Sequence, residues 1–170
     1  MKVLMFGWEY PPHVFGGLAT ANYGITQGLH VQNDLEITLC LPHPFGDEEH
    51  NAAKIIDLGS VPIAWRDPSW ESVCERIGTK MDPQIYFQMR DHIYADFNYM
   101  PVNDMGCLYF SPGYTGNLPE EINNYSIVAG VVARAEEFDI IHAHDWLTYP
   151  AGIHAKMVSG KPLCIHVHAT

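Results

Sequence analysis

Histidine, aspartate and tryptophan gather in two short segments of the chain. His142, His144, Asp145 and Trp146 fall within five positions, and His166 with His168 forms a second pair. Imidazole and carboxylate groups accept hydrogen bonds, exchange protons and bind metal ions. An indole beside a carboxylate also suits carbohydrate, because the ring packs against an apolar sugar face while the carboxylate accepts hydroxyl hydrogen bonds. The residue types therefore leave sugar binding and metal binding both open.

The metal interpretation depends on the spacing of the histidines. Residues two apart on a strand share a face, so each H-x-H pair can direct two imidazoles to one side of a sheet. Imidazole is a good ligand for zinc, and with a carboxylate the set is large enough for a metal-dependent hydrolase. Further carboxylates, which such sites usually recruit from other strands, are not evident. The hydrolase stays the alternative interpretation, and its ligands would be His142, His144, Asp145, His166 and His168.

Simpler structural roles remain open for the same residues. Asp145 is placed to cap a following helix, and His142 could be a hydrogen-bonded core histidine. His168 could be an ordinary polar residue at the start of a loop.

A glycine pair, Gly16 and Gly17, separates the first apolar run from the first helix-like segment. Glycines there allow a ligand to approach the backbone, and the free amides of a first helical turn favour an anion or a polar oxygen. A tight turn without a ligand is the alternative. The pattern G-x-G-x-x-G is absent, so a nicotinamide cofactor is not indicated.

Strand-like and helix-like segments alternate around these residues. Short apolar runs predict strands, and segments with apolar residues every three to four positions predict helices. The predicted strands cover residues 3–6, 35–41, 138–142 and 163–168, and the predicted helices cover residues 18–29, a stretch from 117, and 147–158. This order predicts an α/β fold: a Rossmann-like, mostly parallel sheet with helices on both faces.

The carboxyl ends of parallel strands share one edge, where ligands of open α/β sheets bind. We therefore expect Gly16, Gly17, Asp145, Trp146 and His168 to line one cleft.

The chain is expected to form a single N-terminal Rossmann-like domain over residues 1–170, with an elaborated insertion at 43–115. Residues 54–58 and 61–65 of the insertion read as short strands, and residues around 68–78 and 83–92 read as short helices.

The composition excludes some partners and locations. Nine basic against twenty acidic residues give a net charge of −11, which disfavours binding to nucleic acid. No run approaches the ~20 apolar residues of a membrane span. The cysteines are widely separated, and Cys40 and Cys164 sit in apolar runs that predict buried, reduced thiols. A cytoplasmic location is expected.

Three segments together resemble the N-terminal half of a retaining glycosyltransferase with the GT-B fold, in the glycogen/starch synthase family or a close relative. Residues 3–12 with Gly16-Gly17-Leu18-Ala19 resemble the family's first strand and glycine-rich donor loop. Residues 141–146 closely match its HAHDW stretch. Residues 166–168 resemble the strand that carries its donor-contacting histidine, which corresponds to His168.

The resemblance implies an enzyme that moves a sugar, expected to be glucose, from a nucleotide-sugar of the ADP- or UDP-glucose class to a glycan acceptor. It implies no metal and no other cofactor. His168 is the implied catalytic residue, contacting the transferred sugar. The implied substrate-binding residues are Gly16, Gly17, His144, Asp145 and Trp146.

One departure from the family concerns its K-T-G-G-L pattern, because this chain has Val14 where the synthases usually have lysine. Loss of that cation makes a related sugar transferase more plausible than glycogen synthesis from ADP-glucose. The resemblance also implies a C-terminal nucleotide-binding domain, which this chain lacks. The sequence stops directly after a strand-like run, so we expect the first part of a longer polypeptide that is inactive by itself.

Overall fold

The computed structural model describes residues 1–32, 34–63, 102–103 and 105–168. The chain divides into two compact units, Met1–Val61 with Phe110–Thr170, and Pro62–Tyr109. In the second unit the described residues form isolated antiparallel bridges between Pro62 and Cys107 and between Val102 and Leu108. The helices expected around 68–78 and 83–92 lie outside the described residues. The strand expected at 61–65 is not formed at 61–63, where only Pro62 makes a bridge, and the rest of it is not described.

The first unit is built on a five-stranded sheet in which every pairing is parallel. Its strands are β1 (Lys2–Phe6), β2 (Glu36–Leu41), β3 (Lys54–Asp57), β4 (Ile140–His144) and β5 (Leu163–His166). The spatial order is β3-β2-β1-β4-β5, so the chain leaves β1 on one side for β2 and returns on its other side for β4. The predicted Rossmann-like α/β fold is confirmed. The reversal of order between β1 and β4 marks the edge where this class of fold binds ligands.

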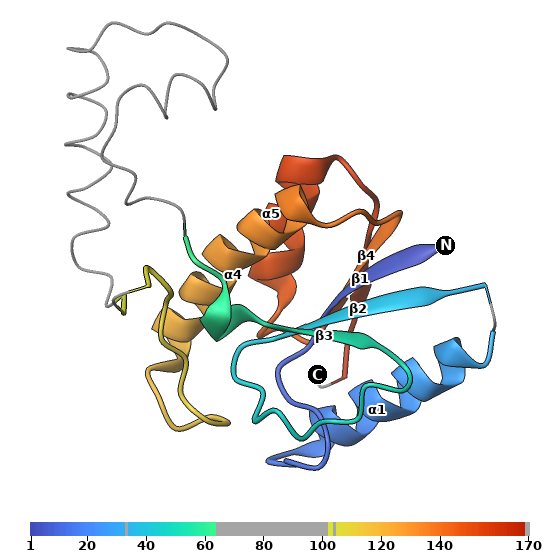
Figure 1. Ribbon diagram of the computed structural model, residues 1–170, viewed down its shortest axis with the longest axis horizontal. Coiled ribbons are helices and arrows are strands. Elements are labelled where there is room, and N and C mark those ends of the chain that lie inside the picture. Colours follow the sequence, from blue (N-terminus) through green and yellow to red (C-terminus); the bar gives the residue numbers. More distant parts are fainter. Residues whose placement is uncertain (33, 64–101, 104, 169–170) are drawn as a thin grey trace, which may run out of the picture. The chain divides into compact units, whose positions relative to one another are not determined.

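Helices cover both faces of this sheet, as Figure 1 shows. Helix α1 (Gly17–His30) follows β1 and lies on one face. Helices α4 (Leu118–Ala135) and α5 (Tyr149–Ser159) pack against each other on the opposite face. A short 3-10 helix, η1 (Leu58–Ser60), follows β3. Within the described ranges, no helix has both the length and the apolar composition that a membrane crossing requires.

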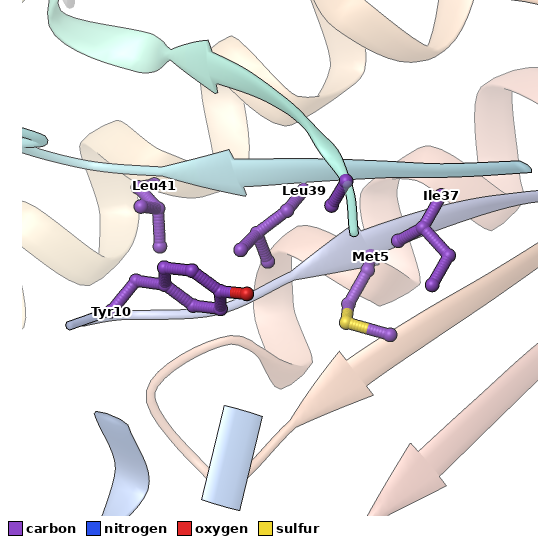
Figure 2. Close-up of a cluster of buried hydrophobic side chains, with 6 residues drawn as sticks. Met5, Tyr10, Ile37, Leu39 and Leu41 are labelled. Atoms are coloured by element: carbon purple, nitrogen blue, oxygen red, sulfur yellow. The ribbon is translucent and has the colours of Figure 1, made fainter. Parts of the chain in front are cut away.

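The core between the sheet and α1 fixes which side chains share that face. Met5, Ile37 and Leu39 are buried there, together with Tyr10 and Leu41 (Figure 2). Side chains of α1, namely Tyr23, Ile25 and Leu29, pack against this cluster. Met5 on β1 is the register partner of His142 on β4, and parallel register partners point to the same side of a sheet. His142 and His144 therefore lie on the α1 face.

Two details differ from the sequence-based expectations. Strand β4 begins and ends two residues later than predicted, so both His142 and His144 lie inside the strand. Cys40 is buried as expected, but Cys164 is exposed. The prediction for Cys164 was wrong because β5 is an edge strand among the described strands, and apolar character alone does not distinguish an edge from the centre of a sheet.

Candidate functional site at the carboxyl edge of the sheet

The loop after β1 is organised by a buried carboxylate, Glu9, which is only 5% exposed. Its Oε2 accepts hydrogen bonds from the backbone amides of Phe15, at 2.7 Å, and Gly16, at 3.0 Å. Its Oε1 accepts one from the Tyr114 hydroxyl at 2.8 Å. Sequence reasoning missed both Glu9 and Tyr114, because a lone loop glutamate and a tyrosine 105 positions away carry no local pattern. The position of Glu9 just past a strand end was the one available signal.

The two glycines have different surroundings. Gly16 is closely packed, since a Cβ at this position would lie 3.2 Å from the Glu9 carboxylate, and its amide is already bonded. Gly17 begins α1, and a Cβ there would meet nothing within 4 Å. No side chain caps the start of α1, and its first turn contains no acidic residue. Amides available to a ligand are therefore expected from Gly17 onward and not at Gly16.

Aromatic packing holds the other side of this loop. The Trp8 indole donates a hydrogen bond to the Gly113 carbonyl at 2.9 Å and stacks on Tyr114, with ring centroids 6.5 Å apart. Burial, the hydrogen bond to Glu9, and the charges of Glu9 and Asp145 all raise the pKa of Tyr114 above its ordinary value. Its hydroxyl therefore stays protonated and remains a donor. Tyr114 thus contacts the glycine loop through Glu9 and also responds to the charge of Asp145.

Asp145 has a left-handed backbone with φ of 65°, in a region that few residues other than glycine adopt. Its amide donates to the His166 carbonyl at 2.8 Å, and its own carbonyl accepts from the amide of Thr148 at 3.0 Å. This conformation costs on the order of 1 kcal/mol, and such strain concentrates at functional sites. The side chain is 9% exposed, and no described residue donates a hydrogen bond to its carboxylate.

The helix-capping interpretation of Asp145 is wrong. Helix α5 has Thr148 as its N-cap residue, and no side chain makes a capping hydrogen bond there. The Thr148 hydroxyl instead donates to the carbonyl of His144 at 2.9 Å. The neighbouring Trp146 is 53% exposed, so a buried carboxylate and a solvent-facing indole stand side by side in sequence after β4.

His144 is fully buried, and its Nδ1 lies 2.9 Å from Nε2 of His168, a hydrogen bond in which the tautomers decide the donor. Burial and the neighbouring imidazoles lower the pKa of His144 to about 3 and that of His142 to about 4. Burial and His166 also lower the pKa of His168, while the charge of Asp145 partly opposes them. All three rings are therefore neutral at pH 7, and neutral imidazoles both donate and accept hydrogen bonds.

Three of the five histidine and aspartate residues of the hydrolase interpretation come together. One ligand atom from each of His142, His144 and His166 lies within 4.8 Å of the others. Among the described residues, Asp145 and His168 do not join that group. The Nε2 atoms of His142 and His144 are buried without a hydrogen-bond partner. His142 is therefore not the fully hydrogen-bonded core histidine of the simpler interpretation.

A hollow beside the glycine loop is too small for a sugar. It measures about 10 Å³, near the minimum that one water molecule needs. Its lining includes Glu9, Phe15, His13 and Phe45.

Packing, a hydrogen bond and nearby charges connect several of the candidate residues. Gly16 packs on Glu9 and lies next to Tyr114, whose hydroxyl is within the field of Asp145. Asp145 in turn acts on His168, which is bonded to His144. The segments after β1, β4 and β5 are thus neighbours, as the parallel topology requires.

Comparison with known proteins identifies the family. The family model of the starch synthase catalytic domain matches residues 2–170. An uncharacterized glycosyltransferase of Methanocaldococcus jannaschii is 23% identical over 170 residues, which is the whole of this chain. The chain spans 31% of that relative's length. The chain belongs to the starch synthase catalytic domain family of glycosyltransferases.

Proposed function

We propose that this chain is the N-terminal half of a retaining glycosyltransferase. The enzyme moves a hexosyl group, expected to be glucose, from a nucleotide-sugar to a glycan acceptor. The chain would supply the acceptor side and part of the donor site. Family membership supports transfer of a sugar. The observation that carries the proposal is the set of polar groups at the carboxyl ends of β4 and β5. It consists of neutral imidazoles, the unbonded carboxylate of Asp145 and the exposed indole of Trp146.

His168 is proposed to contact the transferred sugar. Its Nε2 is engaged with His144, which fixes the ring and leaves Nδ1 for a substrate hydroxyl. His144 thus positions His168 from a fully buried site in β4. A neutral imidazole suits this role, since it offers a hydrogen bond to an uncharged hydroxyl and brings no charge that would need compensation.

Asp145 and Trp146 are proposed to bind the sugar or the acceptor. The Asp145 carboxylate has no donor among the described residues, so its oxygens are available to hydroxyl groups. Trp146, half exposed beside it, offers an apolar face for a sugar ring.

The glycine loop is proposed to approach the sugar more closely than the diphosphate. Glu9 holds the amide of Gly16 and places a carboxylate close to it, and Val14 stands where a lysine would attract phosphate. A diphosphate beside Glu9 would meet like charge, whereas sugar hydroxyls would not. Gly17, with open space around it, is the position where hydroxyls would come closest.

The diphosphate then needs cations from elsewhere. We propose a C-terminal nucleotide-binding domain of the same polypeptide, whose basic side chains and helix amides stabilise the departing diphosphate without a metal. This division also fits the acidic balance of the present chain. The free thiols of Cys40 and Cys164 fit a reducing, cytoplasmic location.

The test is transfer from a panel of nucleotide-sugars to glycan acceptors by the full-length protein and its His168→Ala variant. Loss of a hydrogen bond made to the reacting sugar is expected to lower kcat about 100-fold. His30→Ala, which removes an exposed histidine at the end of α1, is the matched control and should leave kcat unchanged. Unchanged kinetics in His168→Ala would refute the role of His168. Absence of turnover with every nucleotide-sugar would refute the proposal as a whole.

A further inference from the structure

The histidines of β4 and β5 form a cluster on one face of the sheet, here called the imidazole cluster and made of His142, His144 and His166. His144 and His166 are register partners on adjacent strands, and His142 precedes His144 by two positions on the same face. The ring centroids of His142 and His144 are 4.1 Å apart, and those of His144 and His166 are 5.3 Å apart. Parallel pairing therefore brings three rings together from two strands.

The proposed sugar-binding role does not use the Nε2 atoms of His142 and His144. His144 meets His168 through Nδ1, while its Nε2 is buried and unpartnered. The Nε2 of His142 is also buried without a partner. Leaving a buried polar atom unpaired costs about 1–3 kcal/mol, so two such atoms on neighbouring rings, with centroids 4.1 Å apart, point to a ligand that satisfies both.

The hydrogen bond to His168 also prepares His144 for this purpose. When the His144 Nδ1–H donates to His168 Nε2, the Nε2 of His144 carries the lone pair. Histidines that bind metals are usually held in the same way, with one nitrogen donating to a neighbour and the other facing the ion. His168 would then serve as the orienting group for a metal ligand.

We propose that His142, His144 and His166 bind one transition-metal ion of the zinc type, with the fourth coordination position open to water. Three neutral nitrogen ligands without a carboxylate favour zinc and its neighbours over magnesium or calcium, which prefer oxygen. In a tetrahedral zinc site the nitrogens are about 3.4 Å apart, given bonds of about 2.0–2.1 Å. The three ligand atoms already lie within 4.8 Å of one another, so small rotations of the rings close the site.

The ion joins β4 to the edge strand β5 and takes no part in sugar transfer. It fixes His144 and through it His168, so it adjoins the proposed sugar-transfer site and orients one of its residues. The proposal does not depend on the transferase assignment, because its test measures metal binding and not turnover.

The test uses the full-length protein without a histidine tag, stripped of metal with a chelator and titrated with Zn²⁺ by calorimetry. One equivalent is expected to bind, and Co²⁺ in its place should give the visible absorption bands of a tetrahedral nitrogen site. Mg²⁺ should not bind there. His166→Ala is expected to weaken Zn²⁺ at least about 10-fold by removing one ligand. His30→Ala, which removes a histidine far from β4 and β5 in sequence, should bind Zn²⁺ as the unchanged protein does.

Absence of Zn²⁺ binding to the unchanged protein would overturn the proposal, and so would equal affinity in His166→Ala or equal loss in His30→Ala. Circular dichroism shows whether His166→Ala is folded. If it is not, histidine modification by diethyl pyrocarbonate decides the matter in the unchanged protein. Zn²⁺ should then protect His142 and His166, both of which are partly exposed, and lack of protection would overturn the proposal.

Discussion

The loop after β1 and the strands β4 and β5 differ in how the Glu9 carboxylate and the histidine rings are hydrogen-bonded. On the β1 side, both oxygens of Glu9 are used, by the amides of Phe15 and Gly16 and by the Tyr114 hydroxyl. On the β4–β5 side, the Nε2 atoms of His142 and His144 are buried without partners. The Glu9 carboxylate is thus fully used within the β1 loop, whereas the histidines of β4 keep hydrogen-bonding capacity for something the protein binds.

The difference also separates two kinds of functional residue. A glycine loop attracts attention because such loops hold phosphates in other folds. Here the Gly16 amide already donates to Glu9. The buried atoms without a partner include the Nε2 atoms of His142 and His144 on β4. Residues whose polar atoms have no partner within the described structure are therefore better candidates for ligand binding than Gly16, and a sequence motif does not reveal this difference.

The largest effect of a single substitution should come from removing the Glu9 carboxylate. Glu9→Ala leaves two amides and a hydroxyl without their acceptor, so the free energy of unfolding should fall by about 3 kcal/mol or more, measured by urea denaturation. Glu137→Ala is the control, since its side chain is 90% exposed and pairs only with Lys2 at the surface. That change should cost less than about 1 kcal/mol. Similar losses in the two variants would contradict a scaffold centred on Glu9.

The packing of helices on the two faces gives the next effect. A Cβ at Gly152 of α5 would lie 2.9 Å from the Ala143 Cβ and from a methyl of Leu163, so Gly152→Ala should destabilise by about 2 kcal/mol through overpacking. A Cβ at Gly24 of α1 would meet nothing within 4 Å, so Gly24→Ala should stabilise by up to about 1 kcal/mol through helix propensity. Thermal unfolding of both variants checks the prediction. A higher melting temperature for Gly152→Ala would show that α5 does not approach β4 as closely as described, and a lower one for Gly24→Ala would contradict the open space at that position.

The fold was largely predictable from the sequence, because continuous apolar runs and helical periodicity are local signals. The predicted helix at 18–29 corresponds to α1 (Gly17–His30), and the strand at 35–41 corresponds to β2 (Glu36–Leu41). The exposure of Cys164 was not predictable, since the position of a strand within a sheet depends on the strand order and not on its own residues.

The candidate site was predictable only in part. The ends of parallel strands share one edge of a sheet, so the sequence predicts that His168 lies near Asp145, and in the structure the charge of Asp145 acts on His168. The left-handed backbone of Asp145 and the commitment of Gly16 to Glu9 both depend on contacts made in the folded chain. Such contacts produce no spacing or periodicity in the sequence, so they could not be predicted from it.

The last effect concerns pH and tests the β4–β5 side of the comparison. The unfolded chain protonates His144 below about pH 6.5, whereas the folded protein keeps it neutral down to about pH 3. The unfolded state then binds more protons, so the free energy of unfolding should fall by about 1.4 kcal/mol per pH unit as pH is lowered through this window. The imidazoles of His142, His166 and His168 face the same ring.

Denaturation in urea between pH 7 and pH 5, with a chelator present, measures this slope. His144→Gln removes the titrating group and should flatten the pH dependence relative to the unchanged protein. An identical slope in the two proteins would show that His144 is not held neutral by burial.

Hydrogen–deuterium exchange of the full-length protein, with and without a nucleotide-sugar, shows whether the donor binds at the carboxyl ends of β4 and β5. The donor is expected to slow exchange of the amides at residues 145–148, after β4, and at residues 166–168, at the end of β5. Residues 34–36, at the amino end of β2, should exchange at the same rate in both states. Protection confined to other parts of the chain, with none after β4 or β5, would contradict a sugar site at this edge.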